Sequence, residues 1–221
     1  WAHDPAVEPL PHDTAGARRL LEEAGWRNRD SDPWLENDGG EELAITLKIP
    51  ANNEYNRDLA ELIRGDLQDV GVRLTTEATE FGTLIQDIST PARNFEAVLL
   101  ALEADIRLQL RDLFHSDAMP DGPFQLASYS NPELDAILDS IATTVDRDAA
   151  APLWHRLQRI LRDEQPWTWL FFAPRIISAR NDVQGVEMDI RGAFVSLADW
   201  WLEPSNPRAA GAAADSMTGG S

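Results

Sequence analysis

The chain has 221 residues, of which 38 are acidic and 19 basic, so its formal net charge is −19 at pH 7. A surface of that sign repels nucleic acid and anionic lipid headgroups, so both are poor partners. The absence of cysteine excludes disulfides, thiolate metal sites and cysteine nucleophiles. The sequence has no apolar run of membrane-spanning length and does not open with a signal peptide, so we expect a mature form, a cytosolic protein or a fragment.

The first hundred residues predict alternating helices and strands. Three prolines near the start predict an extended connector over residues 1–12. Apolar residues then recur either at helical spacing or in strict alternation. On this basis we expect helices at 14–24, 54–70 and 81–89, and strands at 43–49, 72–79 and 95–102. Such an order predicts an α/β layer in which helices pack on a central sheet.

Two more helices are predicted at 132–144 and 148–164. Asn131 suits the N-cap of the first and Pro132 its first helical position, and an apolar stripe follows at helical spacing. The apolar run 167–179 predicts a long strand, with Trp167 and Trp169 in the core, and 183–190 predicts a weaker strand. Residues 204–221 show no pattern and predict a disordered tail.

Seven segments carry a resemblance to a known family. They are Trp1–Pro9, Ala17–Trp26, Leu67–Val72, Phe95–Val98, Tyr129–Asp135, Leu157–Pro166 and Asp199–Trp201. In this order they resemble the second, C-terminal lobe of the large extracytoplasmic solute-binding proteins of ABC importers, the oligopeptide, dipeptide and nickel class (family 5). The resemblance implies a type II, cluster C periplasmic-binding-protein-like lobe with a central mixed sheet flanked by helices.

The same resemblance implies a domain plan and a function. Residues 1–12 are expected to be the crossover connector and residues 13–203 the second lobe of a two-lobed clamp whose first lobe is missing. The chain is then the ligand-binding lobe of a periplasmic or extracellular solute-binding protein, for peptides. Its expected partners are a peptide or other small solute and, through the full-length protein, ABC permease subunits. We expect it to be a monomer that needs no cofactor and has no catalytic activity. The missing N-terminus leaves room for a lipid anchor.

Two other interpretations stay open. Lobes of this kind also serve in sensory or regulatory modules, and a non-peptide solute such as a nickel chelate or an oligosaccharide is an alternative ligand. A hydrolase is disfavoured because the sequence offers no nucleophile motif and its four histidines lack metal-binding spacing.

The sharpest candidate for ligand binding is Asp105, with Glu103 beside it. Both follow the apolar strand 95–102, where open α/β sheets place their ligands. In peptide-binding members of the family a carboxylate at this strand end pairs with the ligand's α-ammonium. The alternative is a solvated acidic loop. Arg107 and Arg93 are candidates for binding a ligand carboxylate, and surface ion pairs are their alternative.

Three further candidates follow the first two predicted strands. Asn52 and Tyr55 lie in and after the loop that ends the first strand, and a plain helix-capping turn is the alternative. Phe81 follows the second strand, where it either lines the pocket or belongs to the core. The segment Asp30–Glu36 has the alternating carboxylates of a calcium loop without its central glycine, so we expect a surface hairpin.

Overall fold

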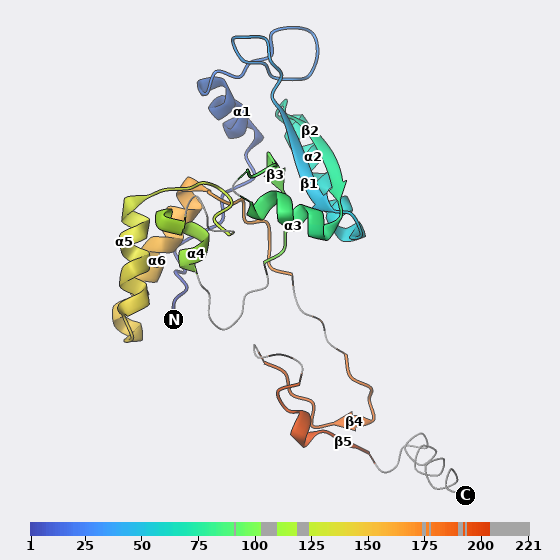
Figure 1. Ribbon diagram of the computed structural model, residues 1–221, viewed down its shortest axis with the longest axis vertical. Helices are drawn as coiled ribbons and strands as arrows, with labels where there is room; N and C mark the ends of the chain where they lie inside the picture. The colour runs from blue at the N-terminus through green and yellow to red at the C-terminus, as the bar shows by residue number, and fades with distance from the viewer. Residues whose placement is uncertain are drawn as a thin grey trace, which may run out of the picture. The chain divides into compact units, whose positions relative to one another are not determined.

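The computed structural model describes residues 1–90, 92–102, 110–118, 124–173, 176, 178–189, 192 and 194–203 (Figure 1). They fall in two compact units, which are described separately. The first takes in the described residues up to Thr168, and the second those from Trp169 onward. Within these ranges, no helix combines the length and the hydropathy that a membrane crossing requires.

A three-stranded parallel sheet organises the first unit, in the order β2-β1-β3. Its strands are β1 (Ala44–Pro50), β2 (Arg73–Thr79) and β3 (Ala97–Val98). Helix α2 (Glu54–Asp69) connects β1 to β2, and α3 (Phe81–Ser89) connects β2 to β3 on the far side of β1. The predicted strand 95–102 is therefore confirmed only over Ala97 and Val98.

The two faces of β1 differ in what they bury. Leu47 and Ile49 point into an apolar cluster that includes Ala60 of α2. Because side chains alternate along a strand, Lys48 points to the opposite face. There its ammonium bonds Asp87 of α3, so the two helices cover opposite faces of the sheet.

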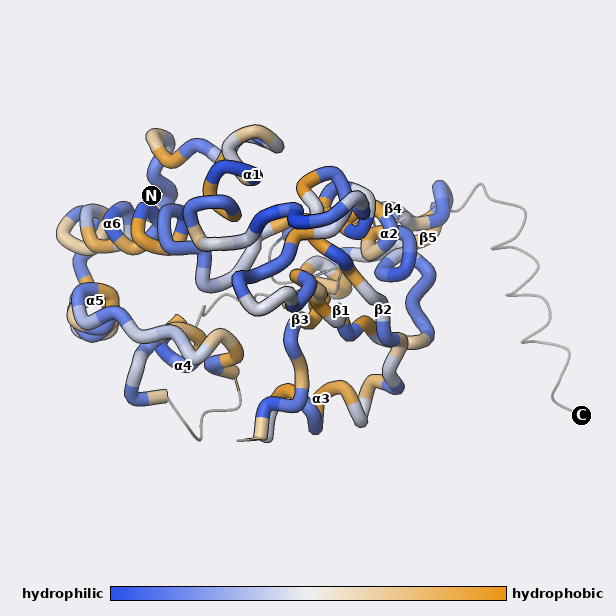
Figure 2. The backbone as a smooth tube through the Cα atoms, turned by 90° about the horizontal axis from the view of Figure 1, so that it is seen from above, coloured by the Kyte–Doolittle hydropathy of each residue, from blue (hydrophilic) through white to orange (hydrophobic). Residues whose placement is uncertain are grey.

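A second apolar core lies among three helices of the first unit. These are α4 (Leu110–Phe114), α5 (Pro132–Thr143) and α6 (Arg147–Glu164), and their shared core includes Phe114, Leu134 and Leu157. Hydrophobic and hydrophilic residues alternate along α6, as expected for a helix with one buried face (Figure 2). Trp167 packs against this core, with its ring centroid 5.1 Å from that of Phe114, as predicted.

The start of α5 is fixed by hydrogen bonds. Asn131 Oδ1 accepts the backbone N–H groups of Glu133 and Leu134 at 2.9 and 3.1 Å, so the predicted N-cap is confirmed. The fully buried Gln125 side chain bonds both the backbone carbonyl and the backbone N–H of Tyr129. The amide of Gln125 thus satisfies both backbone polar groups of Tyr129, shortly before α5 begins.

Residues 1–8, which we name the N-terminal strap, are anchored to α6. Asp4 is 3% exposed. Its Oδ2 accepts from Nε and Nη2 of Arg159 at 2.9 and 2.6 Å. Further along, Nε of Arg162 donates to the backbone carbonyl of Glu8 at 3.1 Å. The predicted connector therefore begins as an anchored segment, followed by α1 (Thr14–Glu23), which Asp13 caps as predicted.

The polar segment before β1 folds as a surface hairpin. The backbone of Arg27 exchanges two hydrogen bonds with Glu36, each of 2.9 Å. Asp30 and Asp32 each accept the backbone N–H two residues on, at 2.8 Å, which is the geometry of turns. This agrees with the predicted hairpin, and no group of metal-binding side chains is found in the described part of the chain.

The second unit contains a two-stranded antiparallel sheet. Strand β4 (Val183–Gln184) pairs with β5 (Trp201–Leu202), and the 3-10 helix η2 (Leu197–Asp199) precedes β5. The predicted strand 183–190 is thus shortened to its first two residues. The predicted strand 167–179 is wrong over its described residues, which form no ladder, and Trp169 is half exposed instead of buried.

Candidate functional site at the strand ends

The three parallel strands of the first unit end at one edge of their sheet. Pro50 of β1 pairs with Thr79 of β2, and Lys48 pairs with Val98 of β3. The chain leaves β1 toward one neighbour and later returns to the other, so this edge is a topological switch point. Open α/β sheets bind ligands at such a point, outside the carboxyl ends of the strands. We name it the strand-end edge.

The structure brings three of the predicted site residues to the strand-end edge. Asn52 follows β1 and is exposed, and its neighbour Asn53 provides the N-cap of α2. Tyr55 lies in the first turn of α2 and is 57% exposed. Phe81 is the first residue of α3 and is 58% exposed, so its alternative as a core residue is wrong. Exposed aromatic side chains beside an exposed amide are groups that hold a ligand by stacking and hydrogen bonding.

The remaining predicted residues do not join this group. Arg93 lies in the turn before β3, at the edge where the strands begin, and it does not approach Asn52 or Phe81 along the sheet. Glu103, Asp105 and Arg107 lie outside the described residues, and Leu102 is the last described residue before them. Their roles at the end of β3 stay predictions.

A carboxylate is fixed beside Phe81. Glu80 caps α3 by accepting the backbone N–H of Thr83 at 3.0 Å. Backbone N–H groups of Gly82 and Thr83 lower the pKa of Glu80, because they stabilise its ionised form. The strand-end edge therefore carries a fixed negative charge near one of its exposed aromatic rings.

Lys48 is the residue that the sequence analysis missed. Its side chain is 9% exposed, and Nζ lies 2.7 Å from Asp87 Oδ2 and 3.6 Å from Glu77 Oε1. The hydrogen bond that Lys48 donates to Asp87 raises the pKa of Lys48 and lowers the pKa of Asp87. Parallel strands are covered on both faces, so a lysine within an alternating strand such as β1 is buried and needs a partner.

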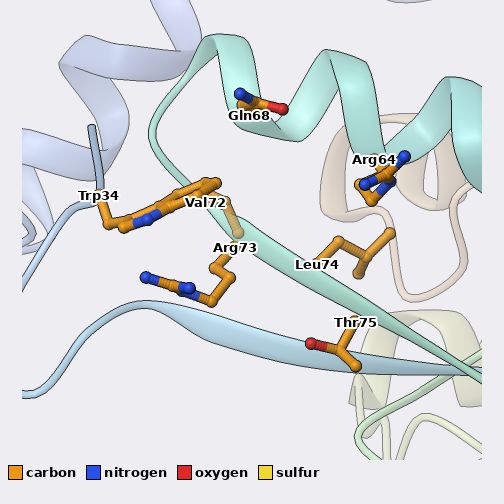
Figure 3. Close-up of a pocket in the computed structure, with 7 residues that line it drawn as sticks. All are labelled: Trp34, Arg64, Gln68, Val72, Arg73, Leu74 and Thr75. Carbon is orange, nitrogen blue, oxygen red and sulfur yellow. The ribbon is translucent and has the colours of Figure 1, made fainter. Parts of the chain in front are cut away.

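A cavity of about 270 Å³ lies elsewhere, between α2 and the beginning of β2 (Figure 3). Arg64 and Gln68 approach it from α2, while Trp34 and Arg73 close it from below. The guanidinium of Arg73 lies 4.5 Å from the Trp34 ring centroid and bonds Glu42 at 2.7 Å. Since Arg64 is also paired, with Glu61, we do not assign this cavity to ligand binding.

Comparison with known proteins gives the same family as the sequence. Residues 1–108 match the family described as bacterial extracellular solute-binding proteins, family 5, middle. The oligopeptide-binding protein AppA of Bacillus subtilis is 23% identical over 202 residues, which are 91% of this chain and 37% of AppA. The glutathione-binding protein GsiB of Pectobacterium atrosepticum is 27% identical over 179 residues, which are 78% of this chain and 32% of GsiB.

The fold is shared with a solved structure of the same relative. The structure of AppA from Bacillus subtilis in complex with a nonapeptide matches with a TM-score of 0.76 and 21% identity, over 92% of this chain and 40% of that one. The resemblance to family 5 and the predicted α/β, periplasmic-binding-protein-like fold are thereby confirmed. Parallel and antiparallel strand pairs both occur, in two separate sheets.

Proposed function

We propose that this chain, a relative of the family 5 solute-binding proteins, is a ligand-binding lobe of an extracytoplasmic solute-binding protein of an ABC importer. The observation that carries the proposal is the strand-end edge, where exposed Tyr55, Phe81 and Asn52 gather at a topological switch point. Matches to an oligopeptide-binding and a glutathione-binding protein support peptides as the solutes.

We further propose that the lobe acts as one half of a clamp. It spans 37% of AppA and 32% of GsiB, so residues 13–203 would work with a first lobe that this sequence does not include. Ligand then favours a closed state through contacts that only the closed state offers, and the closed form docks on the permease subunits. The protein is a binding protein, without a catalytic step.

The identity of the solute is tested by mass spectrometry of the natural full-length protein. The protein is purified under native conditions and denatured, and the released small molecules are identified. We expect peptides. Release of a nickel chelate or an oligosaccharide would contradict the peptide assignment, and absence of any solute together with no binding of added peptides would contradict the function.

The site is tested by two matched substitutions in the same protein. Phe81→Ala removes an exposed aromatic ring from the strand-end edge, and we expect peptide affinity to fall at least tenfold. Leu62→Ala removes an exposed apolar side chain from the middle of α2, where it is 68% exposed, and should leave affinity unchanged. Equal effects of the two variants would contradict the position of the site.

Asp105 is proposed to pair with the α-ammonium of the peptide. Asp105→Asn should weaken a peptide with a free amino terminus by about 1.5 kcal/mol or more, the typical contribution of a hydrogen bond to a charged group. The same peptide acetylated at its amino terminus has no charge there and should bind both proteins equally. Unchanged affinity for the free peptide would refute this role.

A further inference from the structure

The only lysine of the chain, Lys48, is buried at the centre of the sheet. It faces Asp87 on α3 and Glu77 on β2, at 2.7 and 3.6 Å. A buried ammonium is costly unless it is paired, so its presence in a chain whose other basic residues are all arginines calls for a physical reason. We name this group of three charges the Lys48 clamp.

The Lys48 clamp connects three of the elements that border the strand-end edge, namely β1, β2 and α3. Lys48 belongs to β1, which ends two residues later at Pro50, and Glu77 belongs to β2, which ends at Thr79. On α3, Asp87 also accepts the backbone N–H of Asn94 at 3.0 Å through its carbonyl, in the turn that leads into β3. One ammonium therefore ties β1 to β2 and to α3, and the backbone of α3 in turn holds the turn that leads into β3.

Apolar packing alone would hold α3 less specifically. The helix has nine residues, and its buried side chains are Leu84 and Ile88. Two apolar side chains give attraction without direction, so they allow a short helix to slide or rotate on the sheet. A hydrogen-bonded ion pair fixes both distance and direction.

Building on the proposed function, we propose that Lys48 is a positioning residue of the strand-end site. Its ammonium fixes α3 on the sheet and so sets where Phe81, at the start of that helix, meets the ligand. Lys48 itself lies beneath the site and does not touch the solute.

Three variants of the natural full-length protein separate positioning from simple stabilisation. Lys48→Met leaves Asp87, whose side chain is only 20% exposed, without its partner, and we expect lower stability and lower affinity for a random nonapeptide pool. The double variant Lys48→Met with Asp87→Leu buries neither charge, so its stability should return. Its affinity should stay at least tenfold below that of the wild type. Wild-type affinity in the double variant would overturn the proposal.

A second measurement does not depend on the ligand. In the double variant, amide hydrogen exchange over residues 82–86 should be at least tenfold faster than in the wild type, because α3 has lost its directional anchor. Unchanged hydrogen exchange over these residues would overturn the positioning role, whether or not the wild type binds peptide. Absence of peptide binding by the wild type would refute the proposed function instead. Arg64→Gln, which breaks the exposed pair with Glu61, serves as the control and should change neither readout.

Discussion

Tyr129 shows how one polar side chain is held at the edge of an apolar core. It packs against the core of α4, α5 and α6, and its hydroxyl donates to Glu164, which also accepts from Asn131 Nδ2 at 2.9 Å. Burial, followed by the hydrogen bond to Glu164, raises the pKa of Tyr129 to about 12. The native state therefore retains the phenolic proton beyond the ordinary value of 10.0.

A spectrophotometric titration tests this environment. In a Tyr55→Phe variant Tyr129 is the only tyrosine, and we expect its phenolate absorbance to appear about two pH units later in the native protein than in urea. Because the native pKa is the higher one, this group's stabilising contribution is complete below pH 10 and is lost as the pH rises toward 12. Coincident native and unfolded titrations would contradict the buried position of Tyr129.

At the residue scale, local chemistry could be predicted from the sequence, and long-range pairing could not. The caps Asp13 and Asn131 were predicted because a cap bonds N–H groups two or three residues away. The partners of Lys48 are distant in the sequence, since Asp87 is 39 residues on. No pattern of spacing encodes such a pair.

At the scale of elements, Gly71 joins α2 to β2 under the hairpin. Its φ is +82°, and a Cβ atom there would lie 2.8 Å from Leu35 Cγ and 3.2 Å from the Pro33 carbonyl oxygen. Only glycine adopts this conformation without strain and leaves room for the hairpin.

Paired glycine substitutions test this junction. Gly71→Ala should lower the free energy of unfolding by more than about 1 kcal/mol, through both strain and overlap. Gly65→Ala lies within α2 with no atom within 4 Å of the new Cβ, so it should raise stability by about 0.5–1 kcal/mol. Both are measured by urea unfolding, and a loss at Gly65 equal to that at Gly71 would refute the explanation.

Elements with a strong periodicity were predicted closely, and apolar runs were not. Helices α2, α3, α5 and α6 match the prediction to within one residue at each end, because an amphipathic stripe and a cap define them. The run 167–179 is apolar, but apolar composition indicates burial and does not supply a pairing partner. Helix α4 has five residues, too few to show a period, and the sequence analysis missed it.

The residues of the candidate site were also predicted well only where they depend on elements with a strong periodicity. The loops after β1 and β2 were located correctly because the positions of strand ends follow from the strands themselves. Arg93 was chosen by chemical type alone, and the turn before β3 carries it to the opposite edge.

For the whole molecule, net charge and ion pairs predict an acidic optimum of stability. Acidification from neutral pH first relieves the repulsion within a chain of charge −19. Hydrogen bonds and ion pairs lower the pKa values of Asp4, Glu80, Asp87, Asp117 and Glu133.

Thermal unfolding as a function of pH tests the balance between charge repulsion and the stabilising carboxylate contacts. A carboxylate with a depressed native pKa contributes stability that is present above its unfolded value, 3.8 for Asp and 4.5 for Glu, and is lost as the pH falls through the native value. We therefore expect the melting temperature to rise from pH 7 to about 5 and to fall steeply below about 4. Added salt should raise it at pH 7 by screening the repulsion. A melting temperature that falls steadily below pH 7 would contradict this view.

The N-terminal strap gives the chain a defined order of assembly. Asp4 and Arg159 are 155 residues apart, so their contact closes a loop through almost all of the first unit. Closing a long loop costs entropy that contacts between neighbouring residues do not cost, so we expect this contact to form late in folding. We expect Asp4→Asn to accelerate unfolding and to leave the refolding rate nearly unchanged in stopped-flow measurements. During synthesis, the strap would then leave the ribosome before the rest of the first unit and still be among the last parts of that unit to reach its native place.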